Sequence, residues 1–111
     1  MTVSDLTDKC GFTLVAGNSL EAEVNSGYVG DLLSDVMGNA PSNCVWMTVQ
    51  SHQNIIAVAS IVNASVILLC NGRSFEDETL EKAKSTGVNL MKTPLSSFEA
   101  CMKLFEAGFK G

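Results

Sequence analysis

Two uninterrupted apolar runs limit the folds open to this chain more than any other feature of its sequence. Residues 45–49 read Val-Trp-Met-Thr-Val and residues 66–70 read Val-Ile-Leu-Leu-Cys. A strand with one face in water alternates apolar and polar side chains, whereas a strand covered on both faces is apolar almost throughout. The two runs therefore predict two strands of a mainly parallel sheet whose faces are both covered.

The segments around these runs alternate between helical and extended patterns. Further strands are expected at residues 13–16 and 89–92, and a short extended segment near residues 24–29. Helices are expected over residues 2–10, 31–39, 52–64 and 74–86 and from Ser96 onward. Such alternation requires crossover connections. We therefore predict a single three-layer α/β domain over residues 1–111, with a mainly parallel sheet of four to five strands and helices on both faces.

Residue spacing also predicts where the helices begin and end and which sides face inward. Capping boxes are expected for the pairs Thr2–Asp5, Ser74–Asp77 and Ser96–Glu99, and helix stops at Gly11 and Gly87. The inward faces are expected to consist of Leu32, Leu33, Val36, Met37 and Ala40 in the second helix and of Phe98, Cys101, Phe105 and Phe109 in the last.

The charge and the cysteine content argue against several classes of function. The chain has a formal net charge of −5 and a single arginine, Arg73, so it lacks the cation cluster that nucleic-acid binding needs. Its four cysteines lie far apart and its one histidine, His52, has no cysteine at ligand spacing, so neither a metal nor another cofactor is expected. No signal peptide or membrane-spanning run is visible, which favours a cytoplasmic protein with reduced thiols and no membrane contact.

Polar residues follow the predicted strands at their carboxyl ends. In a mainly parallel sheet the crevice outside these ends is the usual ligand site, because several loops converge there. The candidate ligand-binding residues, none of them assigned to catalysis, are Gly27, Gly30, Gln50, His52, Asn54, Asn71 and Thr93. Asp31 disfavours a strongly anionic ligand and Arg73 is the one cation placed to offset it. A polar metabolite or nucleoside-like group is therefore expected.

Some of these residues also have ordinary structural explanations. Gly27 and Gly30 precede a predicted helix N-terminus that could bind an anion, yet a tight turn capped by Asp31 explains the same residues. His52 has the chemistry of a general base, but the sequence shows no nucleophile or orienting partner in place. A polar contact by His52 is therefore expected ahead of catalysis.

The predicted helix over residues 52–64 is apolar on nearly every side. Ile55, Val58, Ala59 and Val62 form the face expected to cover the sheet. A helix that is apolar all round is normally buried on every side, and so small a domain has little else to cover it. We therefore predict a homodimer whose interface includes Ile56, Ala57, Ser60 and Ile61.

Three separated segments resemble the DRTGG domain family. These are residues 23–37, whose core reads Asn-Ser-Gly-Tyr-Val-Gly-Asp-Leu-Leu, together with residues 45–54 and residues 93–99. The five residues that give the family its name appear here as Glu21, Ala22, Asn25, Ser26 and Gly27, so only the final glycine is kept. Because the arginine of the signature is replaced by Ala22, any anion contact that it makes in the family does not carry over.

The resemblance implies an α/β fold similar to the N-terminal domain of HPr kinase/phosphorylase. DRTGG domains are attached to phosphotransacetylases and to pyrophosphatases with CBS domains, and short versions accompany iron-only hydrogenase components. There they resemble regulatory, dimer-forming modules without chemistry of their own. The resulting hypothesis is a non-catalytic regulatory module that dimerises, senses a small metabolite or nucleotide and acts on a partner enzyme of redox or phosphate metabolism. A small enzyme using the polar loops and a purely structural accessory subunit are the alternatives.

Overall fold

The two apolar runs form the adjacent interior strands β3 (Cys44–Thr48) and β4 (Val66–Leu69), and all of their residues are buried. The computed structural model describes residues 1–110. The other strands are β1 (Thr13–Ala16), β2 (Ser26–Val29) and β5 (Leu90–Lys92), and the sheet has the order β1-β5-β4-β3-β2. Strands β2 to β5 are parallel and β1 is antiparallel to β5, which confirms the mainly parallel sheet.

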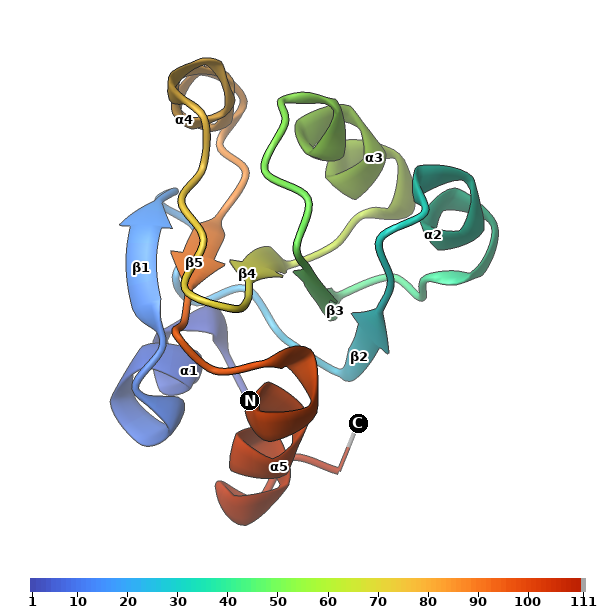
Figure 1. The fold of residues 1–111 in the computed structure, drawn as a ribbon. Coiled ribbons are helices and arrows are strands. Elements are labelled where there is room, and N and C mark those ends of the chain that lie inside the picture. Colours follow the sequence, from blue (N-terminus) through green and yellow to red (C-terminus); the bar gives the residue numbers. More distant parts are fainter. Residues whose placement is uncertain (111) are drawn as a thin grey trace.

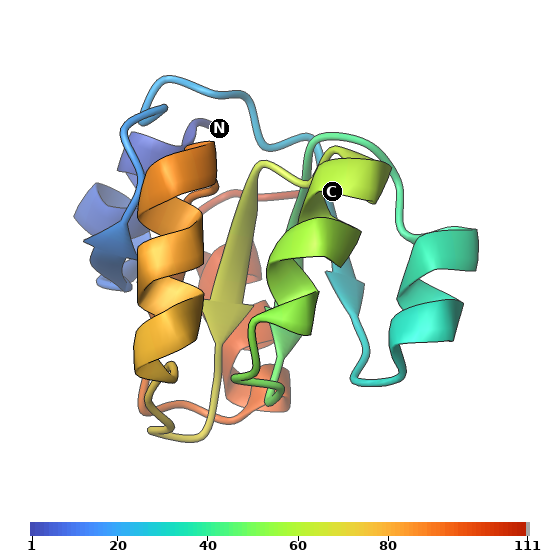
Figure 2. The same ribbon diagram turned by 90° about the horizontal axis from the view of Figure 1, so that it is seen from above.

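Helices lie on both faces of the sheet, as expected (Figures 1 and 2). One face carries α1 (Val3–Cys10) and α5 (Ser97–Glu106), and the other carries α2 (Leu33–Asn39), α3 (Asn54–Val62) and α4 (Asp77–Thr86). Successive side chains of a strand point to opposite faces, so each central strand contributes to two cores. Val45 and Met47 of β3 pack in the core on the α1 and α5 side, whereas Trp46 packs with Ile55 in the core on the other side.

Two of the three predicted capping boxes and both predicted glycine stops are confirmed, and one capping box is wrong. Thr2 and Ser96 make the expected capping boxes, and Gly11 and Gly87 end their helices in the left-handed conformation. Helix α4, however, begins at Asp77 rather than at Ser74 and has no side-chain cap. The reason is that residues 74–76 remain in an extended loop. Phe75 is buried there, and the Glu76 amide donates a hydrogen bond of 3.3 Å to the Ser51 carbonyl oxygen.

The inward faces of α2 and α5 differ from the prediction. In α2 only Val36 is buried, and Leu32, just before the helix, is 68% exposed, because α2 lies over the edge of the sheet and meets little more than α3. In α5 the buried residues are Ala100 and Leu104. The rings of Phe98 and Phe105 point away from the core, 74% and 65% exposed.

The apolar surface of α3 is covered within the monomer more fully than expected. Ile55, Val58, Ala59 and Val62 are buried, which confirms the predicted sheet-facing side. Ile56 is also buried, because α2 packs beside α3 and places Val36 in the same core. The predicted exposure of Ile56 is therefore wrong, and this side chain is not available to a second subunit. Ala57, Ser60 and Ile61 are exposed, and their place in a dimer interface stays a prediction.

Candidate functional site

The carboxyl ends of the four parallel strands lie together at one edge of the sheet, which faces the viewer in Figure 1. The loops that leave this edge contain Gly30, Gln50, His52, Asn71 and Thr93, and Asn54 begins α3 beside them, so most of the predicted ligand residues are gathered there. Gly27 is an exception, because it lies inside β2 opposite Val45 and not in a loop. It is therefore a strand residue and not part of this edge.

Asp31 joins two of these loops and does not cap α2. Its Oδ1 accepts hydrogen bonds from Thr48 Oγ1 at 2.9 Å and from the Val49 amide at 2.8 Å. The N-cap position of α2 is Leu32, which makes no side-chain cap, so the predicted capping role of Asp31 is wrong. These hydrogen bonds hold the Asp31 carboxylate against the end of β3.

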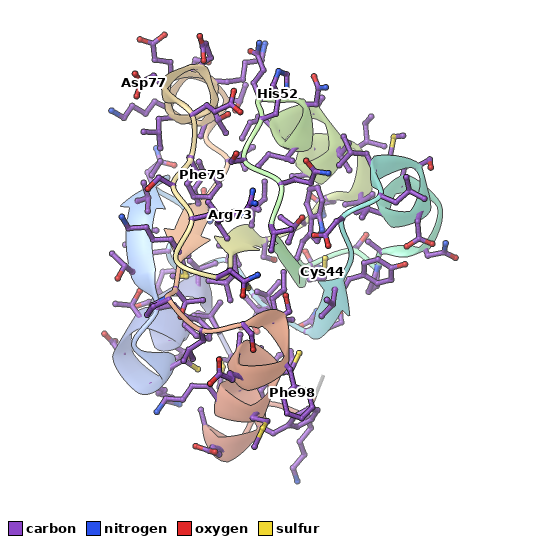
Figure 3. The ribbon with its side chains drawn as sticks, viewed as in Figure 1. Cys44, His52, Arg73, Phe75, Asp77 and Phe98 are labelled. Carbon is purple, nitrogen blue, oxygen red and sulfur yellow. The ribbon has the colours of Figure 1, made fainter. Side chains whose placement is uncertain are left out.

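Two predicted ligand residues on the second loop are also engaged inside the chain. Gln50 Nε2 donates to the Asp31 carbonyl oxygen at 2.9 Å. His52 Nδ1 accepts from the Asn54 amide at 3.2 Å, at the start of α3. Figure 3 shows His52 well above Arg73, at the level of the helices. Within residues 1–110, no hydrogen bond joins His52 to a hydroxyl, thiol or carboxylate group, so the geometry offers it no nucleophile.

The loops after β4 and β5 are tied together by their backbones. The Asn71 amide donates to the Leu95 carbonyl oxygen at 2.8 Å, and the Gly72 amide donates to the Thr93 carbonyl oxygen at 3.1 Å. Asn71 and Gly72 both have positive φ, 65° and 67°, which turns the chain sharply after β4. This turn holds Arg73 over the edge of the sheet, where its Nη1 donates to the Val49 carbonyl oxygen at 3.2 Å.

A small pocket of about 190 Å³ opens beside this turn. It is lined by Thr13, Gly72, Arg73, Lys92, Thr93 and Pro94. The lining thus combines two cations with two hydroxyl side chains and includes no carboxylate. A guanidinium and an ammonium group in such a setting suit a phosphate-bearing ligand.

Lys92 and Thr13 were not among the predicted site residues. Lys92 ends the parallel strand β5, whereas the position of Thr13 depends on the antiparallel pairing of β1 with β5, which places it opposite Lys92. The direction of β1 cannot be deduced from four residues of local sequence, because its partner residues lie 74 or more positions further along the chain. A lysine that ends the last parallel strand is the one signal that could have indicated a cation at this edge.

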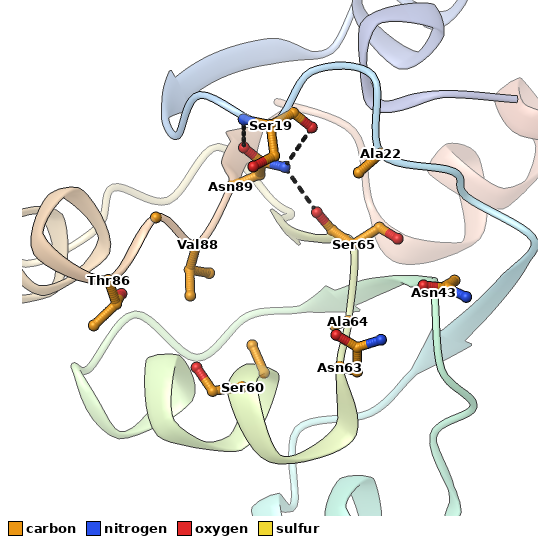
Figure 4. Close-up of a pocket in the computed structure, with 12 residues that line it drawn as sticks. Ser19, Ala22, Asn43, Ser60, Asn63, Ala64, Ser65, Thr86, Val88 and Asn89 are labelled. Carbon is orange, nitrogen blue, oxygen red and sulfur yellow. Dashed lines mark hydrogen bonds between the residues drawn. The ribbon is translucent and has the colours of Figure 1, made fainter.

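A larger hollow of about 360 Å³ lies at the opposite edge of the sheet (Figure 4). Its lining is uncharged and consists of Ser19, Ala22, Asn43, Ala59, Ser60, Asn63, Ala64, Ser65, Thr86, Gly87, Val88 and Asn89. The side-chain amide of the buried Asn89 forms hydrogen bonds within the fold. Its Nδ2 donates to the carbonyl oxygens of Ser19 at 3.2 Å and Ser65 at 3.0 Å, and its Oδ1 accepts from the Ser19 amide at 3.3 Å. Asn89 therefore braces three segments.

The four cysteines are free thiols placed in or beside the cores. Burial raises the pKa of Cys10, Cys44, Cys70 and Cys101. Across residues 1–110, no three His, Cys, Asp or Glu side chains converge in a way that could hold a metal ion. None of the described helices is both long and apolar enough to cross a membrane.

The raised thiol pKa values predict that stability falls in alkaline solution. Above about pH 8.5 the thiols ionise in the unfolded chain while they stay protonated in the folded one. This ionisation stabilises the unfolded state and so lowers the free energy of unfolding. The urea midpoint should be level near neutral pH and lower at pH 9.5. Cys44→Ala should show a smaller fall because it lacks one buried thiol. A wild-type midpoint that is unchanged or higher at pH 9.5 would contradict this expectation.

The comparisons with known proteins identify the fold. No family model matches the chain, and no curated protein is similar to it in sequence. The structure is similar to the crystal structure of the CBS and DRTGG domains of the regulatory region of Clostridium perfringens pyrophosphatase, complexed with its activator diadenosine tetraphosphate. The TM-score is 0.69 at 14% sequence identity, over 96% of this chain and 46% of that one. The α/β fold that the DRTGG resemblance implied is thereby confirmed, and the chain spans about half of the structure that it matches.

Proposed function

We propose that this chain is a non-catalytic regulatory module that binds a phosphate-bearing nucleotide at the carboxyl edge of its sheet. The observation that carries the proposal is the pocket between Arg73 and Lys92, which has two cations and no carboxylate in its lining. The similarity in fold to a regulatory region solved with a dinucleotide activator supports the same class of ligand. This choice departs from the nucleoside-like group expected from the sequence, because Asp31 is not among the residues that line the pocket whereas Lys92 is.

The same edge supports binding rather than chemistry. The polar groups nearest the pocket hold the loops in place: Thr93 Oγ1 accepts from the Leu95 amide at 3.3 Å and Thr48 Oγ1 donates to Asp31. A nucleophile needs an adjacent base and access to its substrate. The Thr48 hydroxyl is hydrogen-bonded to the Asp31 carboxylate but is fully buried, and within residues 1–110 no hydrogen bond joins the Thr93 hydroxyl to a base. We further propose that the module forms a homodimer and passes the ligand signal to a partner enzyme in the reducing cytoplasm.

A thermal-shift series with diadenosine tetraphosphate, ATP and adenosine tests the proposed function. A ligand that binds only the folded state raises the melting temperature in a saturable way. The two phosphate-bearing probes should stabilise the protein and adenosine should not. Chromatography of each probe after incubation should recover it unchanged. Conversion of a probe into products would show that the protein is an enzyme. Stabilisation by adenosine alone would show that the ligand is a nucleoside rather than a phosphate-bearing nucleotide.

Arg73→Gln is expected to weaken binding of diadenosine tetraphosphate by about tenfold or more, because a hydrogen bond to a charged group contributes about 1.5–3 kcal/mol. Isothermal titration calorimetry gives the affinity directly. Lys84→Gln is the matched control, since it removes one exposed positive charge at the far end of α4. It should leave the affinity nearly unchanged. Equal losses in both variants would indicate only a general charge effect and would contradict a contact by Arg73.

A further inference from the structure

A stripe of large apolar side chains lies open on α5. Phe98, Met102 and Phe105 follow one another at i, i+4 and i+7, and they are 74%, 48% and 65% exposed. Figure 3 shows Phe98 extending from α5 toward solvent. Single exposed apolar side chains are ordinary on a protein surface, whereas a contiguous stripe marks an interaction surface.

The stripe continues into an apolar groove between α5 and the edge strand β2. The groove has a volume of about 160 Å³ and is lined by Gly27, Val29, Met47, Cys101, Leu104, Phe105, Phe109 and Lys110. Val29 is half exposed beside it. Phe105 belongs to both the stripe and the groove, so the two form one surface. We call this surface, which consists of Phe98, Met102, Phe105, Val29 and the groove, the α5–β2 face.

The strand beside the stripe has an unprotected edge. Folded proteins commonly guard the free edge of a sheet with a lysine, a proline or a bulge. Strand β2 reads Ser-Gly-Tyr-Val and pairs with β3 in regular register, so it has none of these devices. At the other edge, β1 has a register shift between Leu14 and Ala16. Of the two edges, only the one that adjoins the apolar stripe therefore lacks a lysine, a proline and a bulge, although both edge strands are only four residues long.

We infer that a second copy of this chain covers the α5–β2 face through a two-fold contact. This inference specifies the homodimer of the proposed function and rests on it. A two-fold interface uses the same patch on both subunits, so the patch must complement itself. The α5–β2 face has both of the required parts, since Phe98 projects from it and the groove accepts an apolar side chain.

The charges on α5 also complement a second copy. Glu99, Lys103 and Glu106 of α5, followed by Lys110 just beyond the end of the helix, alternate in sign and sum to zero, whereas the whole chain has a net charge of −5. In an antiparallel arrangement Glu99 comes opposite the lysine at 110 of the other copy while Lys103 comes opposite its Glu106. Like charges directly opposed would instead disfavour association. This helix can thus approach its own copy although the protein as a whole is acidic.

The surface of α3 offers a weaker interface. Ile61 is its one large exposed apolar side chain, at 67%, and Ile56 is buried in the monomer. Ser60 lines the uncharged hollow at the amino edge of the sheet and is not part of an apolar patch. Ile61 is therefore a suitable control position, since it is an exposed apolar side chain on the opposite side of the sheet.

Sedimentation equilibrium of the full chain, from about 1 to about 300 µM, tests the inference. Wild-type protein should associate to a dimer within this range. The double variant F98E/F105E should weaken the dimer by about a hundredfold or more, because it places two pairs of charges in a desolvated apolar contact. Both positions are exposed, so the circular dichroism spectrum and the unfolding midpoint should stay close to wild type. The single variant I61E should dimerise like wild type.

Each outcome bears on a different statement. If F98E/F105E dimerises as strongly as wild type, the α5–β2 face is not the interface. If I61E dissociates the dimer while F98E/F105E does not, the dimer of the proposed function stands and its interface lies on α3. If wild-type protein is a monomer throughout the range, both the inferred interface and the proposed dimer are wrong. The proposal of nucleotide binding is tested separately by the thermal-shift series.

Discussion

Replacing Gly17 with alanine is expected to lower the free energy of unfolding by about 3 kcal/mol or more. Gly17 follows β1 with a φ of 110°, a conformation that side chains of L-residues rarely adopt. A Cβ atom there would lie 2.1 Å from Asn89 Oδ1 and 2.6 Å from the Asn89 Cα. Because Asn89 is buried and holds hydrogen bonds to Ser19 and Ser65, it cannot move aside without breaking them. Chemical denaturation monitored by circular dichroism measures the loss.

Gly38→Ala is the matched control for this variant. Gly38 lies inside α2, and a Cβ atom there would meet no heavy atom within 4 Å. Alanine has the higher helix propensity, so this change should stabilise the protein by about 0.5–1 kcal/mol. The same chemical substitution is thus expected to have opposite signs at two positions. A Gly17→Ala variant as stable as wild type would show that the chain relaxes around residue 89 at little cost.

Replacing Trp46 with alanine should cost about 3–5 kcal/mol, which is a large part of the stability of a domain of this size. Trp46 is the largest fully buried side chain and lies in the core beneath α3. Its Nε1 donates a hydrogen bond of 2.9 Å to the Gly30 carbonyl oxygen, so the ring also holds the loop that leads to Asp31. Urea denaturation should show a much lower midpoint, and the loops at the carboxyl edge should lose protection from hydrogen exchange.

Two variants separate packing from hydrogen bonding at this position. Trp46→Phe keeps an aromatic ring and loses the donor, so it should cost less than Trp46→Ala. Leu32→Ala removes a large apolar side chain that is 68% exposed and should change stability by no more than about 0.5 kcal/mol. If Leu32→Ala proved as damaging as Trp46→Ala, the core would not be where the structure places it.

The central strands and their helices could be predicted because the local pattern and the tertiary environment agree. Residues 45–49 are apolar on both faces, and the structure buries Val45 and Trp46 in opposite cores. The capping boxes at Thr2 and Ser96 are likewise local, since each is completed within four residues. Such features depend little on the rest of the fold.

The inward faces of the helices were harder to predict, because apolar periodicity does not show how many side chains of a helix the sheet will cover. On α5 the fully buried residues are Ala100 and Leu104, and the rings of Phe98 and Phe105 remain on the surface, whereas Phe109 is buried as predicted. On α3, by contrast, a side chain that was predicted to be exposed is buried. Ile56 is covered by α2, and the packing of one helix against another cannot be deduced from the periodicity of either.

The candidate site was predicted in place but only partly in composition. Alternation of strands and helices implies parallel strands, so the loops with Asn71, Arg73 and Thr93 were expected at one edge of the sheet. The hydrogen bonds that engage Asp31 and Gln50 join residues of different loops and depend on exact geometry, whereas that of His52 is local. Thr13 joins the site only through the antiparallel pairing of β1 with β5.

The most direct test of nucleotide binding is a titration of ¹⁵N-labelled protein with diadenosine tetraphosphate, followed by amide chemical shifts. We expect saturable shifts at Gly72, Arg73 and Thr93, which line the cationic pocket at the carboxyl edge, and at the adjoining Asn71. The uncharged hollow at the opposite edge serves as the internal control, and the amides of residues 60, 63 and 88 should not shift. Shifts centred on that hollow, or no shifts with excess probe, would contradict the proposed site.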